Sequence, residues 1–339
     1  MFDTLYFGTY TKRDSKGIYT AQLDLSTGQL SALELLTPET SPTYLAFNPS
    51  GQLYSVAGQN GQGGIGAYRL TGELLNHVLE DGASLCYVAY DGPRQLVYGS
   101  NYHKGQVTAY RIEENGRLAL VDAVNQEGSG PHPNQASSHV HFSDLTPDKY
   151  LVTCDLGADR VTTYSVSDAG KLTPINHYQA QPGSGPRHLV FHSHFKMAYL
   201  ACELNSTVET LVYDGVGDFD YLSQQTTLPA DYQGDNTVGA IRMSQDGKFV
   251  YVSNRGHNSI TVFKILSDGN LQQVQIVPSH GDFPRDFNFS SDQNFLIVVH
   301  QESDNATVFK RNPQTGHLEL LSSDFYVPEA VFVSTNPYQ

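Results

Sequence analysis

The stretch from Phe249 to Leu271, FVYVSNRGHNSITVFKILSDGNL, contains the pattern that decides the fold. It opens with a run of apolar and aromatic residues, turns through a polar segment, and continues with a second apolar run at Ile260–Phe263. The sequence Asp268-Gly269-Asn270 follows, and its glycine provides the positive φ that a hairpin turn needs. Short apolar runs between turn signals are typical of β-strands, so we predict successive antiparallel strands here.

The same unit recurs along the whole chain. In each unit, the two apolar strands described above follow an earlier strand, which ends in an aromatic or apolar residue that we call the anchor. These anchors are Phe47, Tyr90, Phe142, Phe191, Met243, Phe289 and Val333. A repeat of about 40–50 residues with about four strands is typical of a β-propeller. We therefore predict an all-β fold, a seven-bladed β-propeller with four-stranded antiparallel blades, in a single domain over residues 1–339.

The two ends of the chain are predicted to share one blade. The last unit has only its first strand, Glu329–Val333. The beginning of the chain offers the missing three strands, at Leu5–Phe7, Gly17–Tyr19 and Leu30–Leu36. Strands from both termini would then close the ring, which removes a free sheet edge.

The charge composition restricts the classes of partner. The chain has 20 Lys and Arg against 35 Asp and Glu, a formal net charge of −15 at pH 7. This balance argues against nucleic-acid binding, which needs a basic surface, and against a polybasic membrane-binding protein. No apolar run is as long as the roughly 18 residues that a membrane-spanning helix needs. The N-terminus has no secretion-signal pattern.

The cysteines indicate the compartment. Cys86, Cys154 and Cys202 are widely spaced and odd in number, so they fit neither a disulfide framework nor a metal knuckle. We expect them to act as small apolar residues rather than as nucleophiles. A reducing cytoplasm is the location that this pattern favours.

The propeller plan predicts which side chains meet at the central channel. The first strand of a blade lies innermost and the second runs antiparallel to it. The start of the first strand and the end of the second therefore lie at the same mouth. Polar and charged residues that occupy these positions are His139, Asp155, Arg187, Glu203, Arg255, Arg285 and Gln301.

These residue types restrict the chemistry. Several guanidinium groups in an acidic protein indicate an anionic ligand, because Arg binds phosphate or carboxylate with two donors. An Arg can also stabilise a developing oxyanion, and His139 or Glu203 could accept a proton from water or from carbon. The alternative is that Arg187, Glu203 and Arg255 form a structural ion-pair network between blades. His139 and His141 have a spacing that is possible for metal ligands, but no third ligand is evident, and we expect no metal and no other cofactor.

Several motifs resemble the seven-bladed lactonase family, which includes the propeller-type bacterial 6-phosphogluconolactonase and the fungal carboxymuconate-lactonising enzyme. The resemblance extends from Leu5 to Val333. Its motifs are Gly8-Thr-Tyr-Thr11, Gly17-Ile-Tyr19, Gly185-Pro-Arg-His188, Glu203-Leu-Asn-Ser206, Val252-Ser-Asn-Arg-Gly256, Asn258-Ser-Ile260 and Phe283-Pro-Arg285. It implies a lactone-active propeller and, for bacterial cytoplasmic members, hydrolysis of 6-phosphogluconolactone to 6-phosphogluconate.

The resemblance also implies site residues. A His, two Arg and a Glu form the proposed site of the muconate relatives, and they match His139, Arg187, Glu203 and Arg255 here. We assign substrate binding to a second group, Asp155, Arg285, Gln301 and His188. The expected substrate is a phosphorylated sugar lactone, opened without a metal. The alternatives are a cycloisomerase acting on carboxymuconate-type dicarboxylates and a non-catalytic propeller that binds a protein or a sugar. The oligomeric state is not predicted.

Overall fold

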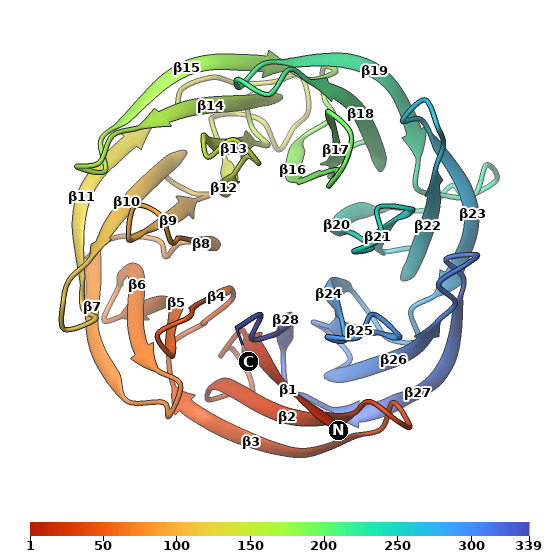
Figure 1. Ribbon diagram of the computed structural model, residues 1–339, viewed down its shortest axis with the longest axis horizontal. Coiled ribbons are helices and arrows are strands. Elements are labelled where there is room, and N and C mark those ends of the chain that lie inside the picture. The colour runs from red at the N-terminus through yellow and green to blue at the C-terminus, as the bar shows by residue number, and fades with distance from the viewer. Residues whose placement is uncertain (339) are drawn as a thin grey trace.

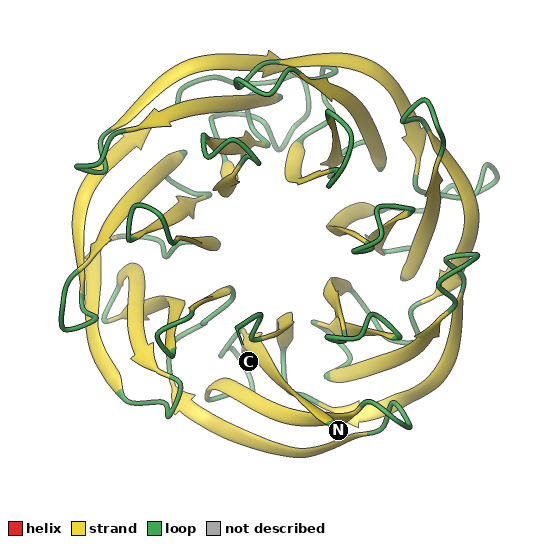
Figure 2. Cartoon of the chain, viewed as in Figure 1, coloured by secondary structure: helices red, strands yellow, loops and turns green. Residues whose placement is uncertain are grey.

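The fold is a ring of seven antiparallel sheets. The computed structural model describes residues 1–338. All regular secondary structure in that range is β-strand, and the range contains no helix. The sheets each contain four strands and stand around a common axis (Figures 1 and 2). This arrangement confirms the predicted seven-bladed β-propeller.

Each sheet is described from its innermost to its outermost strand. The first three sheets contain β4 (Leu45–Asn48), β5 (Gln52–Gln59), β6 (Gln62–Arg69) and β7 (Leu74–Asp81); β8 (Tyr87–Asp91), β9 (Leu96–Asn101), β10 (Gln106–Ile112) and β11 (Leu118–Asn125); and β12 (Val140–Leu145), β13 (Leu151–Asp155), β14 (Arg160–Val166) and β15 (Leu172–Gln179). The next three contain β16 (Pro186–Phe191), β17 (Met197–Cys202), β18 (Thr207–Tyr213) and β19 (Phe219–Thr226); β20 (Thr237–Met243), β21 (Phe249–Arg255), β22 (Ser259–Ile265) and β23 (Leu271–Pro278); and β24 (Pro284–Phe289), β25 (Phe295–His300), β26 (Asn305–Arg311) and β27 (Leu318–Tyr326).

The seventh sheet joins the two ends of the chain. Its innermost strand is β28 (Ala330–Thr335), followed outward by β1 (Phe2–Thr9), β2 (Gly17–Asp24) and β3 (Leu30–Pro38). Phe7 of β1 pairs with Val333 of β28. Figure 1 shows the red and blue ends of the chain side by side in this sheet. The predicted closure of the ring by both termini is confirmed.

The turn predicted at Gly269 is also confirmed, and the same turn recurs before other outermost strands. Five glycines in these turns adopt positive φ, between 75° and 85°. Each is followed two residues later by the leucine that begins the outermost strand. The glycines are Gly28, Gly116, Gly170, Gly269 and Gly316.

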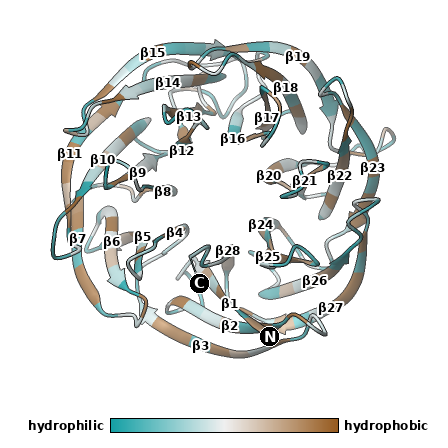
Figure 3. Cartoon of the chain, viewed as in Figure 1, coloured by the Kyte–Doolittle hydropathy of each residue, from teal (hydrophilic) through white to brown (hydrophobic). Residues whose placement is uncertain are grey.

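Burial explains why the sequence pattern differs between strands. All seven residues of β21 are buried, whereas in β23 at the circumference every residue after the buried Leu271 is exposed or half-buried. Figure 3 shows the corresponding mixture of hydrophobic and hydrophilic stretches along outer strands such as β15 and β19. Between sheets, aromatic side chains fill the space, as where Tyr251 packs edge-on against Phe289 with ring centroids 5.2 Å apart. Burying one such side chain contributes about 1.5–3 kcal/mol.

A β-bulge recurs in the innermost strands and changes the direction of side chains near the centre of the ring. In five sheets the register between the first and second strands slips at the same place. Pro186 pairs with Cys202 and His188 with Ala201, so Arg187 between them has no partner residue. A bulge of this kind changes the direction of the extra side chain. The extra residues in the other sheets are His141, the pair Gly239 and Ala240, Arg285 and Val331.

The bulges also correct two of the predicted anchors. In β16 the bulge follows Pro186, and the anchor Phe191 lies five residues after Pro186. In β12 the bulge follows Val140, and the residue five positions later is Leu145. Leu145, not Phe142, is therefore the equivalent of Phe191. By the same register the equivalent residue in β28 is Thr335 rather than Val333. Aromatic character led to the wrong residue in β12, because Phe142 occupies the position next to the bulge.

Candidate active site

One end of the ring axis holds a cavity with a volume of about 370 Å³. This size is in the ordinary range for a small-molecule site. The cavity lies where the innermost strands begin and the second strands end, which is the mouth predicted from the sequence. Its lining residues are Tyr10, Ser41, Thr43, Ala83, Ser84, Leu85, Cys86, Tyr102, His103, His141, Glu203, Arg255 and Arg285.

The bulged residues form the deep end of this cavity. His141 and Arg285 line both the main cavity and a narrow extension below it, and Arg187 lines the extension. The three residues occupy the same bulge position in three different sheets. Because the bulge aims each side chain away from the blade, all three side chains enter the cavity or its extension. The long side chain of Arg285 reaches from the extension toward Tyr10 at the edge of the cavity, with its guanidinium 5.5 Å from the centre of that ring.

Glu203 links two arginines beside the extension. Its Oε2 lies 2.8 Å from Nε of Arg187 and 2.9 Å from Nη2 of Arg255. The two arginine side chains are 3% and 5% exposed, and that of Glu203 is 17% exposed. The buried guanidinium groups also donate to carbonyls of β20, Arg187 to Gly239 and Arg255 to Val238. The cluster thus joins two neighbouring sheets while facing the cavity.

Gly239 allows this arrangement. A Cβ atom on it would lie 2.5 Å from Oγ of Ser253 and 2.9 Å from the carbonyl oxygen of Arg285. The Ser253 hydroxyl, in β21 of the same sheet, is held by the N–H of Ala240, and the Arg285 carbonyl belongs to the backbone of β24 in the neighbouring sheet. A residue larger than glycine at position 239 would therefore require β20 and β24 to move apart.

The electrostatics of the cluster keep Glu203 ionised. Burial acts to raise the pKa of Glu203, but Arg255, Arg187 and Arg285 outweigh it and hold the pKa below its ordinary value. Burial lowers the pKa of Arg187, and so does the neighbouring Arg255, while Glu203 opposes both effects. A carboxylate held by two guanidinium groups is a weak proton acceptor. One negative and three positive groups leave a net positive site in an acidic protein.

His141 is the buried imidazole of the cavity lining. Burial lowers its pKa well below the ordinary value, and the charges of Arg187, Arg285 and Arg255 add to this effect. The side chain is 5% exposed, and Nδ1 has no hydrogen-bond partner among residues 1–338. A neutral imidazole with a free nitrogen next to guanidinium groups is suited to accept a proton.

His139 lies beside the cavity rather than in its lining. Its ring stacks on Tyr102 with centroids 4.3 Å apart, and its Nδ1 lies 2.9 Å from the Tyr102 carbonyl oxygen. His139 precedes β12, and His141 is itself the bulged residue of that strand. Residues two apart share a face only in a regular strand, so the spacing of His139 and His141 does not place them on one face.

Asp155 is not brought to the cavity. It is completely buried and its Oδ1 accepts hydrogen bonds from the backbone N–H groups of His139, Gly157 and Ala158. The strand register makes Asp155 the equivalent of Cys202, one residue before the position of Glu203. Neighbouring residues on a strand face opposite sides. The prediction that Asp155 faces the mouth is therefore wrong, and its carboxylate orders the loop that carries His139.

His188 lies one layer below the bulged residues. It is 3% exposed, and its ring lies 5.7 Å from Phe142 and 5.5 Å from Tyr87, measured between centroids. Tyr44 and Phe332 extend this aromatic layer, with Tyr44 packed 4.1 Å from Tyr87. The layer separates the cavity from a second cavity at the opposite end of the axis, which His188 also lines.

Arg285 lines the cavity, whereas Gln301 is not among the lining residues and contacts Arg285 from beside it. Nη1 of Arg285 lies 3.4 Å from Oε1 of Gln301, and its guanidinium lies 5.5 Å from the centre of the Tyr10 ring. Gln301 also donates to Glu302. Within residues 1–338, Arg285 makes no ion pair with a carboxylate, which leaves its charge available to a ligand.

Sequence reasoning missed most of the uncharged lining. Tyr102 follows Tyr90 at the spacing that separates Glu203 from Phe191, and Cys86 precedes Tyr90 as Arg187 precedes Phe191. Applying the same spacing to uncharged residues would have found both. Burial raises the pKa of Cys86 to about 12, so it is a thiol at neutral pH and a poor nucleophile.

Among residues 1–338, no three His, Cys, Asp or Glu side chains gather closely enough to form a candidate metal site. The same part of the chain contains no helix that is long and apolar enough to span a membrane.

A seven-bladed propeller with an arginine-rich, histidine-containing cavity at one mouth defines an enzyme-like site for a small anionic molecule. Comparison with known proteins identifies the family. Residues 4–335 match the family model described as lactonase, 7-bladed beta-propeller. The chain therefore belongs to this family and is a lactonase by class, an enzyme that hydrolyses a cyclic ester.

Individual relatives agree with this membership. The chain is 40% identical over 338 residues to the 6-phosphogluconolactonase of Bacillus subtilis, covering 97% of both proteins. A solved protein from Lactobacillus plantarum is 45% identical with a TM-score of 0.97, covering 98% of this chain and 99% of that one. The periplasmic gluconolactonase of Pseudomonas aeruginosa is 30% identical with a TM-score of 0.89, at the same coverage. The resemblance inferred from the motifs is confirmed.

Proposed function

We propose that the protein hydrolyses a phosphorylated sugar lactone, 6-phosphogluconolactone, to 6-phosphogluconate, a reaction of the pentose phosphate pathway. The observation that carries the proposal is the position of His141, which lines the cavity together with Arg255 and its narrow extension together with Arg187, and whose pKa burial and the arginines lower. The name of the Bacillus subtilis relative supports the choice of substrate. The three free cysteines favour a cytoplasmic location, because a reducing compartment keeps thiols unpaired.

The arginines prepare the ester for attack. The carbonyl oxygen of the lactone accepts hydrogen bonds from the guanidinium groups of Arg187 and Arg255. These groups are desolvated and fixed by Glu203 and by the carbonyls of β20. Fixed donors of this kind stabilise the negative charge that develops on the oxygen during attack. Glu203 acts by holding both arginines and not as the base.

His141 moves the proton. It accepts a proton from a water molecule as the water oxygen bonds to the carbonyl carbon, giving a tetrahedral oxyanion. The oxyanion collapses, the bond from the carbon to the ring oxygen breaks, and the imidazolium returns its proton to that oxygen. The net reaction consumes one water and gives one hydroxy acid.

The direct test is an assay of the purified protein on freshly made 6-phosphoglucono-δ-lactone, after subtraction of the spontaneous rate. We expect enzymatic opening that EDTA does not affect and that is faster, at equal concentration, than opening of unphosphorylated gluconolactone. Opening of neither lactone would refute the proposal. Turnover of a carboxymuconate instead would assign the same arginines to a dicarboxylate.

A further inference from the structure

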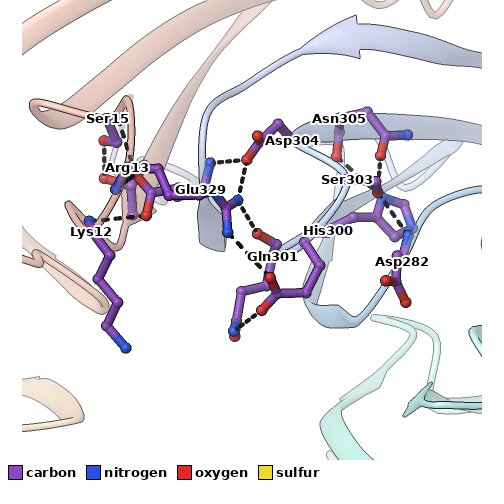
Figure 4. Close-up of polar contacts among 12 residues, drawn as sticks. Lys12, Arg13, Ser15, Asp282, His300, Gln301, Ser303, Asp304, Asn305 and Glu329 are labelled. Carbon is purple, nitrogen blue, oxygen red and sulfur yellow. Dashed lines mark hydrogen bonds and ion pairs between the residues drawn. The ribbon is translucent and has the colours of Figure 1, made fainter.

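The segment between β1 and β2, residues 10–16, crosses the outer edge of the cavity and is called the strap here. Its first residue, Tyr10, lines the cavity. The first family motif ends at Thr11, and the candidate site described above assigns no function to residues 12–16 of the strap. Figure 4 shows these residues against the loop that follows β25.

The buried carboxylate of Glu329 fixes the backbone of the strap. Glu329 is 1% exposed, and its side chain accepts hydrogen bonds from the N–H groups of Lys12, Arg13 and Ser15 at 2.9–3.0 Å. Its carbonyl accepts a fourth, from the N–H of Tyr10 at 3.0 Å. A chain segment held at four points is a rigid support for side chains at the edge of the cavity (Figure 4).

Arg13 attaches the strap to the neighbouring sheet. Its guanidinium lies 2.7 Å from Asp304 and 3.1 Å from Glu302, and it donates to the carbonyl of Gln301. The carboxylates of Asp304 and Glu302 therefore neutralise the positive charge of Arg13. Arg13 has a structural role and is not available to a ligand.

Lys12 is different. Its Nζ lies 4.3 Å from the centre of the Tyr10 ring, and it forms no ion pair within residues 1–338. Figure 4 shows its side chain extending away from Glu329. Arg285, which also has no carboxylate partner in that range, lies 5.5 Å from the same ring centre. The two cationic groups are thus less than about 10 Å apart, and both lie next to Tyr10. Tyr10 and Arg285 line the cavity, and Lys12 is an exposed residue beside that lining.

We propose that Lys12, Tyr10 and Arg285 form a phosphate-binding subsite at the outer end of the cavity. This inference rests on the proposed function, because it assigns the phosphate end of the same substrate. A phosphate dianion matches two uncompensated cations, whereas Arg187 and Arg255 already share the charge of Glu203. The phosphate would then lie at the strap and the lactone ring at His141.

The test measures binding of the product by calorimetry, so that it does not depend on turnover. The probes are 6-phosphogluconate and gluconate, which differ only in the phosphate. We expect the wild-type protein to bind 6-phosphogluconate more tightly. We expect Lys12→Met to weaken that binding about tenfold, and Arg285→Met at least as much, with gluconate binding unchanged in Lys12→Met.

Lys16→Met is the matched control. Lys16, like Lys12, is an exposed lysine of the strap, but within residues 1–338 its ammonium makes no contact with the Tyr10 ring. This variant therefore removes the same charge from the protein and should bind both probes normally. Equal binding of 6-phosphogluconate by the wild type and Lys12→Met would overturn the subsite, as would an equal loss for both probes or in Lys16→Met. Absence of 6-phosphogluconate binding to the wild type would also overturn it. Lys12-dependent binding in a protein that opens no lactone would refute the proposed function and leave the subsite standing.

Discussion

Replacing Arg187 by methionine is expected to lower kcat/KM for lactone opening by about 100-fold or more. Arg187 is nearly inaccessible to solvent and is fixed by Glu203 and by the Gly239 carbonyl. Removing a preorganised donor to an oxyanion typically has an effect of this size, because water cannot replace it in a closed site. Steady-state kinetics of the folded variant provide the measurement.

Arg311 offers a matched control for the loss of a buried arginine. It is 4% exposed and donates to the hydroxyl of Tyr251 and the carbonyl of Gln293, outside the lining of the cavity. Arg311→Met should lower the melting temperature but leave kcat/KM close to the wild-type value. A folded Arg187→Met protein with wild-type kinetics would remove Arg187 from the reaction. Equal losses in both variants would show that the effect is only structural.

Replacing His141 by asparagine is expected to lower kcat by about 10²–10⁴-fold, the usual contribution of a general base. Asparagine preserves the polarity and approximate size of the side chain but cannot take the proton from water. His139→Asn is the informative comparison, because His139 lies next to the cavity but stacks on Tyr102 and bonds its carbonyl. We expect that variant to lose less than about tenfold. The opposite ranking would make His139 the base.

The pH profile of the wild-type enzyme tests the same role independently. A histidine base must be neutral to act, and burial together with three arginines lowers the pKa of His141 well below its ordinary value. His141 therefore stays neutral at and below pH 6.5, the ordinary pKa of histidine. We expect kcat to be constant from pH 8 to pH 6.5 and to fall only at lower pH. A decline that begins above pH 6.5 would contradict the assignment.

The fold was predictable because its signals are local and repeated. Each outermost strand that follows a turn glycine begins at the predicted leucine, such as Leu118 and Leu271. The positive φ of these glycines is a property of the turn and does not depend on distant contacts. The missing strands of the last sheet were found by the same pattern at the beginning of the chain.

The site was predictable only in part. Charged residues at the ends of apolar strands stand out in a sequence, and this signal identified Arg187, Glu203 and Arg255. The strand register confirms that Glu203 and Arg255 occupy equivalent positions in their sheets. The bulge was not visible in the sequence, so His139 was selected although His141 carries the side chain that lines the cavity.

The wrong prediction that Asp155 faces the mouth also arose from the strand register. The hairpin of β12 and β13 is one residue shorter than that of β16 and β17, which shifts the spacing from the anchor. A shift of one residue moves a side chain to the other face of the strand. Asp155 therefore faces the backbone of its own sheet, where it accepts hydrogen bonds, and Leu156 takes the position of Glu203.

A structure of the protein with bound 6-phosphogluconate tests the central claim most directly. We expect the product in the cavity at this mouth, with its carboxylate at Arg187 and Arg255, its neighbouring carbons near His141, and its phosphate between Lys12 and Arg285. Product in the cavity at the opposite end of the axis, or bound with its carboxylate remote from both Arg187 and Arg255, would contradict the account.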